Sequence, residues 1–141
     1  MILVTQWQYS SNDQLLWVEG NIGKGETMLL ISIINKLHNK AQSISISDGG
    51  IISYFLYQAT DLCLNNVLTI FRGLIYLLIT QWPLLVIHLQ DKYEHTGSKL
   101  FDNGSAFYSL SEVFREILLD CQQKPICLAI NSLDKCKEEL L

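Results

Sequence analysis

The stretch that decides the fold reads LLWVEGNIGKGET and covers residues 15–27. Leu15 to Val18 is a short apolar run of the kind that forms a buried strand. A glycine-rich turn follows directly, and glycine lets several backbone N–H groups converge on one point. The stretch therefore predicts a strand that ends in a tight loop.

A helix with one buried face is predicted behind this loop, from about Gly25 to His38. Its apolar residues recur at helical spacing, at Leu30, Ile33, Ile34 and Leu37. The N-terminus of a helix carries a partial positive charge and directs N–H groups outward. Strand, glycine loop and helix in this order are the layout of a phosphate-binding loop, whose pattern is G-x-x-x-x-G-K-[ST].

Gly20, Gly25 and Thr27 match this pattern, but Glu26 stands where the pattern has a lysine. The lysine attracts the outer phosphates, whereas a carboxylate repels them. A unit charge pair about 4 Å apart is worth roughly 4 kcal/mol at an effective dielectric near 20, enough to erase micromolar affinity when its sign is reversed. A carboxylate at a helix N-terminus is itself favourable. Glu26 is therefore predicted to accept hydrogen bonds from the backbone amides of Gly23 to Thr27, and so to occupy the place of the phosphate.

Two further apolar runs predict strands, IISYFLY at residues 51–57 and ICLAI at residues 126–130. The polar stretch from Asn39 to Gly50 predicts an exposed connection before the first of them. Helical segments separate the strands, which implies an α/β fold with a parallel sheet covered by helices on both faces.

Three helices are predicted between these strands from their end signals. The signals are Asn65 or Asn66 as the first cap, Pro83 and Gly97 at the start and end of the second helix, and a capping box formed by Ser109 and Glu112 for the third. Residues 73–89 carry no formal charge, which leaves a membrane span as a minor alternative. Two helices joined at Pro83 fit this segment better, because polar residues and the proline interrupt it.

The bulk composition limits the function classes. A chain of 141 residues is one domain's worth, and a net charge of −4 at pH 7 offers no basic surface for nucleic acid. No secretory signal is recognisable, so the cytoplasm is expected. The cysteines (Cys63, Cys121, Cys127 and Cys136) and the histidines (His38, His88 and His95) lack metal-ligand spacing, so no structural metal is expected. Arg72, in an apolar helix, is expected to form a salt bridge or extend its stem to solvent.

A family resemblance runs from Leu15 to Cys136. LLWVEGNIGKGETMLL, SYFLYQATD, NNVLTIFRGLIYLL, KYEHTGSKLF, SLSEVFREIL and LAINSLDKC resemble segments of the NACHT module of fungal STAND-class P-loop NTPases. This group includes heterokaryon-incompatibility proteins and overlaps the nephrocystin-like N-terminal domain. The resemblance implies a three-layer P-loop sheet with helices on both faces, and a signalling switch that binds Mg-ATP or Mg-GTP and oligomerises. It divides the chain into an N-terminal flank, residues 1–14, and a partial domain, residues 15–141.

The resemblance also assigns candidate site residues. The Walker A loop is Gly20, Asn21, Ile22, Gly23, Lys24, Gly25, Glu26 and Thr27, and the Walker B-like segment contributes Asn131, Asp134 and Lys135. Thr27 and Asp134 are metal ligands only if Mg²⁺ binds. Relatives commonly carry a lysine at the position of Lys24 as well as at that of Glu26, so Lys24 is expected to face solvent.

The departures from the family pattern remove or reverse charge. Besides Glu26, Asn131 replaces an aspartate and Lys135 replaces the glutamate that would act as general base. No catalytic residue is assigned, and impaired nucleotide binding without hydrolysis is expected. Two strands that follow the Walker B strand in the family are expected to be missing, leaving the sheet incomplete at its C-terminal side. The alternative reading is a non-catalytic interaction fragment that docks onto full-length relatives as a homo- or hetero-oligomer.

Overall fold

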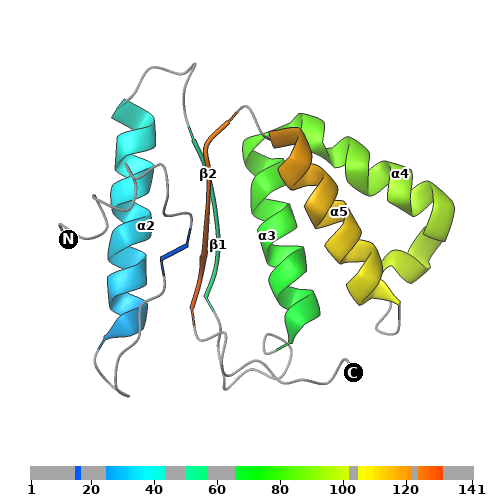
Figure 1. Cartoon of the computed structure of the whole chain (residues 1–141), viewed down its shortest axis with the longest axis horizontal. Coiled ribbons are helices and arrows are strands. Elements are labelled where there is room, and N and C mark those ends of the chain that lie inside the picture. The colour runs from blue at the N-terminus through cyan, green and yellow to red at the C-terminus, as the bar shows by residue number, and fades with distance from the viewer. Residues whose placement is uncertain are drawn as a thin grey trace.

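The structure is a computed structural model that describes residues 15–16, 25–43, 50–56, 66–101, 105–121 and 124–131. Figure 1 shows the helices and strands formed by these residues. In chain order they are α2 Glu26–Ser43, β1 Ile51–Phe55, α3 Val67–Gln81, the 3-10 turn η1 Pro83–Leu85, α4 Val86–Thr96, the 3-10 turn η2 Gly97–Phe101, α5 Ala106–Asp120 and β2 Ile126–Ile130.

The two described strands lie side by side and run parallel, in register from Ile51 opposite Ile126 to Phe55 opposite Ile130. The ladder begins where Ile51 N donates to Pro125 O at 2.9 Å. Helices α3, α4 and α5 lie between the strands in sequence, which is the long crossover that parallel pairing requires. Both predicted strands and their parallel pairing are therefore confirmed, although β1 ends at Phe55, short of the predicted end at Tyr57.

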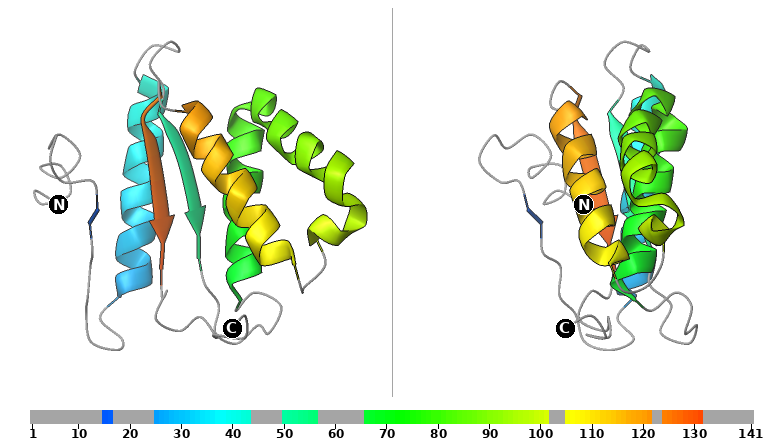
Figure 2. Two further views of the ribbon diagram at one scale, coloured as in Figure 1. Left: turned by 45° about the vertical axis from the view of Figure 1, so that its right-hand side comes forward. Right: turned by 90° about the vertical axis from the view of Figure 1, so that its right-hand side faces the viewer.

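Each face of this sheet is covered by helices, with α2 on one side and α3 and α5 on the other (Figures 1 and 2). Successive strand residues face opposite sides. Ile51 accordingly packs into the core beneath α3 and α5, and Ile52 packs with Ile33 and Leu37 of α2. The described part is a mixed α/β fold, mostly helical around a two-stranded parallel sheet. The larger three-layer P-loop sheet expected from the resemblance remains a prediction.

The main core lies between the sheet and the helices of the crossover. Its most deeply buried members each have 0% of their surface exposed, and they are Leu78, Leu85, Leu100, Ala106, Val113 and Ile117. Gly73 lets α3 approach β1 closely, because a Cβ at this position would lie 2.8 Å from Cδ2 of Phe55. The hydroxyl of the buried Ser53 donates to the carbonyl of Leu74 at 2.9 Å, so its burial leaves no unmet donor.

The predicted helix ends are confirmed in two helices. Asn66 caps α3, with its Oδ1 accepting from Thr69 N at 2.9 Å. Pro83 opens η1 immediately before α4, and Gly97 caps α4 with φ = 61°, a left-handed conformation that favours glycine.

The predicted capping box at Ser109 and Glu112 is wrong. Helix α5 starts at Ala106, one turn earlier, so Ser109 lies inside the helix. Ala106 is fully buried beside the buried Leu110. Packing of this extra apolar turn outweighs a cap, which is worth about 1 kcal/mol.

Two expectations near the N-terminal half also need correction. Leu15 is 79% exposed and neither it nor Leu16 belongs to a strand, so these two residues do not form the predicted buried strand. Trp17 and Val18 lie outside the described residues. Helix α2 extends to Ser43 rather than ending near His38, so the first part of the expected exposed connection is helical. Lys40 in its last turn favours this extension through the helix dipole.

The uncharged run from Gly73 to Leu89 is broken as expected. Helix α3 ends at Gln81, and Pro83 starts a new turn that leads into α4. Of the helices in the described ranges, none combines the length and apolar character needed to cross a membrane.

Candidate functional site

The first turn of α2 and the carboxyl end of β2 meet at one end of the sheet (Figures 1 and 2). There Nδ2 of Asn131 donates to Oγ1 of Thr27 at 3.3 Å, across 104 residues of sequence. These are the last residue of the glycine-rich motif and the first residue of the Walker B-like segment. The structure therefore brings together one candidate residue from each motif.

Asn131 is held in place by the sheet itself. Its backbone N–H donates to the carbonyl of Phe55 at 3.4 Å, which continues the ladder one residue beyond β2. Both strands end at this edge because they are parallel. In open α/β sheets, ligands bind outside the carboxyl ends of the strands, so this edge is the position at which a ligand is expected.

Gly25 provides the backbone conformation at the start of α2. Its φ of 82° lies in the left-handed region, and a Cβ added there would meet no atom within 4 Å. Glycine is thus favoured by its backbone angle rather than by lack of space. Its carbonyl accepts from Leu29 N at 2.9 Å, which begins the helical hydrogen bonding of α2.

Glu26 is the first residue of α2 and its side chain is exposed. Within the described ranges its carboxylate has no hydrogen bond to the amides of Gly25 or Thr27. Those two hydrogen bonds of the self-filling hypothesis are therefore not seen, and the amides of Gly23 and Lys24, which the hypothesis also names, lie outside the described residues. The position still favours a negative charge through the helix dipole.

The remaining candidate residues lie outside the described residues. They are Gly20, Asn21, Ile22, Gly23 and Lys24 of the loop, and Asp134 and Lys135 of the Walker B-like segment. The predictions made for them stay predictions.

The described part of this edge offers two uncharged side chains to a magnesium ion, and Asp134, the other expected ligand, lies outside the described residues. Mg²⁺ prefers carboxylate and phosphate oxygens. Thr27 offers a hydroxyl and Asn131 a neutral amide whose Nδ2 already points at that hydroxyl. The described residues contain no group of three or more His, Cys, Asp or Glu side chains arranged to hold a metal.

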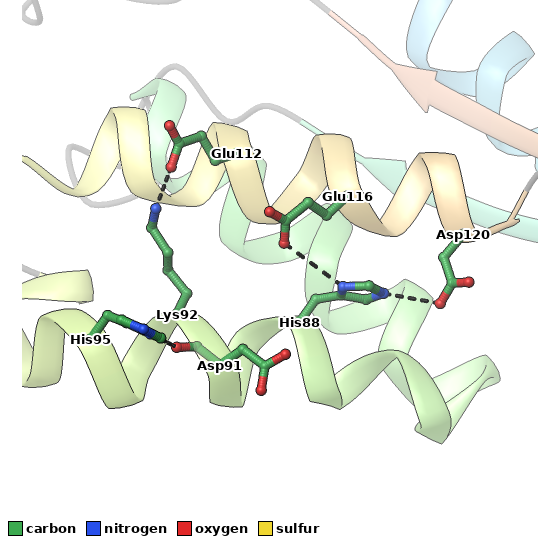
Figure 3. Close-up of polar contacts among 7 residues, drawn as sticks. All are labelled: His88, Asp91, Lys92, His95, Glu112, Glu116 and Asp120. Carbon is green, nitrogen blue, oxygen red and sulfur yellow. Dashed lines mark hydrogen bonds and ion pairs between the residues drawn. The ribbon is translucent and has the colours of Figure 1, made fainter.

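A separate polar cluster that the sequence did not reveal joins α4 to α5 (Figure 3). His88 lies between two carboxylates, with Nε2 2.9 Å from Oδ2 of Asp120 and Nδ1 3.7 Å from Oε2 of Glu116. One helical turn further along, Lys92 pairs with Glu112. The Lys92 ammonium lowers the pKa of Glu112, first by hydrogen bonding and then by its charge. This cluster lies across the sheet from α2, and its contacts join α4 to α5.

Other singled-out side chains have structural explanations. Arg72 is exposed and donates to the backbone carbonyl of Phe101, which fits the expected stem that extends to solvent rather than the alternative salt bridge. His38 lies edge-on to Tyr54, with ring centroids 6.4 Å apart. Burial raises the thiol pKa of both Cys121 and Cys127, as expected of unreactive packed cysteines.

One hollow among the described residues lies away from the Thr27 and Asn131 contact. It is an open groove of about 370 Å³ on α4 and η2, lined by Leu89, Gln90, Tyr93, Glu94 and Phe101. Its walls carry no convergent set of N–H donors, so it lacks the chemistry of a phosphate site.

The comparisons with known proteins establish the class of protein to which this fold and edge belong. Residues 3–140 match the family described as Nephrocystin 3, N-terminal. The match covers almost the whole chain, and the chain belongs to this family.

One relative is the vegetative incompatibility protein HET-E-1 of Podospora anserina. It is 39% identical to this chain over 135 residues, which cover 96% of this chain and 10% of that protein. The expected resemblance to nephrocystin-like and heterokaryon-incompatibility proteins is thereby confirmed. No solved structure matches the chain.

Proposed function

We propose that this chain is a NACHT-type nucleotide-binding module of a signalling switch, with impaired ATP or GTP binding and no hydrolysis. The supporting observation is the hydrogen bond between Thr27 and Asn131. It joins the start of a helix, preceded by a left-handed glycine, to the carboxyl end of a parallel strand. That arrangement is the frame of a phosphate site in α/β proteins.

The charges around Thr27 and Asn131 support the proposed weakening of nucleotide binding. Glu26 places an exposed negative charge on the first helical turn, where a phosphate would approach. Asn131 contributes a neutral amide that holds the Thr27 hydroxyl by hydrogen bonding. Both features weaken binding of a magnesium-bound polyphosphate, the first by repulsion and the second by the loss of a negative charge.

Fluorescent ATP and GTP titrations in Mg²⁺ test this proposal. The native chain is expected to bind only at millimolar concentrations. Glu26→Gln removes the repulsion and Glu26→Lys restores an attraction, so affinity should rise in that order, by about tenfold or more per step. Adding Asn131→Asp to Glu26→Lys should then make binding depend more strongly on Mg²⁺.

Two results would contradict the proposal. Micromolar binding by the native chain would show that Glu26 does not impair the site. Equally weak binding by all four proteins, each with a native circular dichroism spectrum, would show that the frame no longer functions as a nucleotide site.

A second candidate function is a non-catalytic fragment that docks onto full-length relatives as an oligomer. It is favoured by β2, where Leu128 is 37% exposed. The parallel ladder directs the backbone groups of Ile126, Leu128 and Ile130 away from β1. Co-purification with a tagged full-length relative tests this reading, and Leu128→Pro, which blocks strand pairing, should abolish the association.

A further inference from the structure

The outer edge of β1 carries hydrogen-bonding groups that do not face β2. Ile51 N donates to Pro125 O, and Phe55 O accepts from Asn131 N, so the odd-numbered residues of β1 bond to its partner strand. The alternation of a parallel ladder directs the N–H and C=O groups of Ile52 and Tyr54 to the opposite edge. Within the described ranges the sheet holds β1 and β2 alone, so no described strand meets these groups.

The side chain of Gln81 meets the edge groups of Ile52. Its Oε1 accepts from the N–H of Ile52 at 3.1 Å, and its Nε2 donates to the carbonyl of Ile52 at 2.7 Å. One primary amide thus meets both backbone groups of one strand residue. A residue of a neighbouring strand would offer the same donor and acceptor.

Gln81 is held in this position by its own helix. Its Nε2 also donates to the carbonyl of Leu77 at 2.8 Å, one turn back along α3. The adjacent Leu78 is fully buried, and the Lys124 ammonium lies 4.4 Å from the ring centroid of Trp82. The end of α3 is therefore fixed against β1, which lowers the entropy lost in holding the amide at the strand edge.

We propose that Gln81 is an edge plug that prevents β1 from pairing with β1 of a second copy of this chain. The sequence of β1 is IISYF, an apolar and uncharged segment rich in β-branched and aromatic residues. Such a segment on a sheet edge is a template for edge-to-edge association. A second copy brings the identical segment, and two such edges can satisfy each other's backbone groups.

The edge plug depends on both the length and the amide group of glutamine. Asparagine has the same amide but is one methylene too short to reach Ile52 from the same backbone position. Methionine matches the length of glutamine but has no N–H or carbonyl. Gln81→Met and Gln81→Asn should therefore both open the edge, although one is apolar and the other polar.

The test compares these two variants with native chain and with Gln90→Met, which makes the same exchange on the exposed side of α4. Light scattering after gel filtration gives the oligomeric state over a hundredfold range of concentration. Hydrogen exchange, read at the Ile52 amide, reports whether the edge is covered. Circular dichroism establishes which variants are folded.

At low concentration, both Gln81 variants should exchange the Ile52 amide about tenfold faster than native chain, the change expected for loss of one hydrogen bond. At high concentration they should form dimers or larger species, and the Ile52 amide should regain protection. Gln90→Met should behave like native chain in both measurements.

Three results would overturn the proposal. The first is unchanged exchange at Ile52 in a folded variant, which would mean that Gln81 does not cover the edge. The second is faster exchange without association at any concentration, which would mean that the exposed edge does not recruit a second copy. The third is loss of folding in both variants, which would assign Gln81 to folding alone.

Discussion

The two faces of the sheet are stabilised by cores of different size. On one face Ile33 and Leu37 of α2 pack against Ile52 of β1, and the partly buried Tyr54 and Cys127 lie at the margin of this small cluster. On the other, α3 and α5 enclose a much larger cluster, and α4 is joined to α5 by His88 and Lys92. The candidate site lies on the first face, at the start of α2. Charge changes at Glu26 and Asn131 are therefore remote from the residues that contribute most to stability.

The largest effect on the free energy of unfolding should come from substitutions that create a cavity, compared between the two faces of the sheet. Leu78→Ala removes a fully buried side chain from the large cluster, and large-to-small changes of this kind cost about 2 to 5 kcal/mol. Leu37→Ala, at a position 8% exposed in the small cluster, should cost at most half as much. Urea denaturation measures both. Equal losses would mean that the two faces contribute equally to stability.

A smaller effect should come from overpacking between α3 and β1. Gly73→Ala places a methyl group 2.8 Å from the ring of Phe55, and strain of this kind costs about 1 to 3 kcal/mol. The double variant Gly73→Ala/Phe55→Leu should recover part of the loss relative to Phe55→Leu alone. A double-mutant cycle from urea midpoints gives the coupling, and strict additivity would contradict the close contact.

The smallest effect concerns the Lys92 and Glu112 pair, which lies on the surface. The lysine lowers the pKa of Glu112 from its usual value of 4.5, so the pair stabilises the fold above pH 4.5. That contribution is lost as the pH falls through the lowered pKa. Lys92→Met should raise the pH midpoint of acid unfolding slightly, whereas Lys99→Met should leave it unchanged. An identical midpoint for native chain and Lys92→Met would exclude a role for the pair.

The predicted parts of the fold were those determined by local pattern. Apolar runs identified β1 and β2, and the cap at Asn66 was confirmed. The capping box at Ser109 was wrong because burial of Ala106 is a tertiary effect that no local pattern contains. The buried strand predicted at Leu15 was wrong for a related reason. An apolar run indicates only that burial would be favourable, and the fold decides whether burial occurs.

The candidate site was predictable in its motifs but not in its contacts. The strand end and the glycine loop indicated that Thr27 and Asn131 belong to one site, and the structure brings the two together. The hydrogen bonds between Gln81 and Ile52 join residues 29 positions apart. The contact between His88 and Asp120 joins residues 32 positions apart. Such pairs depend on how helices dock, so a single sequence holds no signal for them.

The position of Gln81 has a consequence for the order of events during synthesis. Ile52 lies 29 residues from Gln81, whereas its strand partner Cys127 lies 75 residues away, the difference between positions 127 and 52. Closing the shorter loop costs about 0.8 kcal/mol less entropy. Because the chain leaves the ribosome from its N-terminus, Gln81 emerges long before β2 does. We therefore expect the nascent β1 to contact Gln81 first and to pair with β2 afterwards.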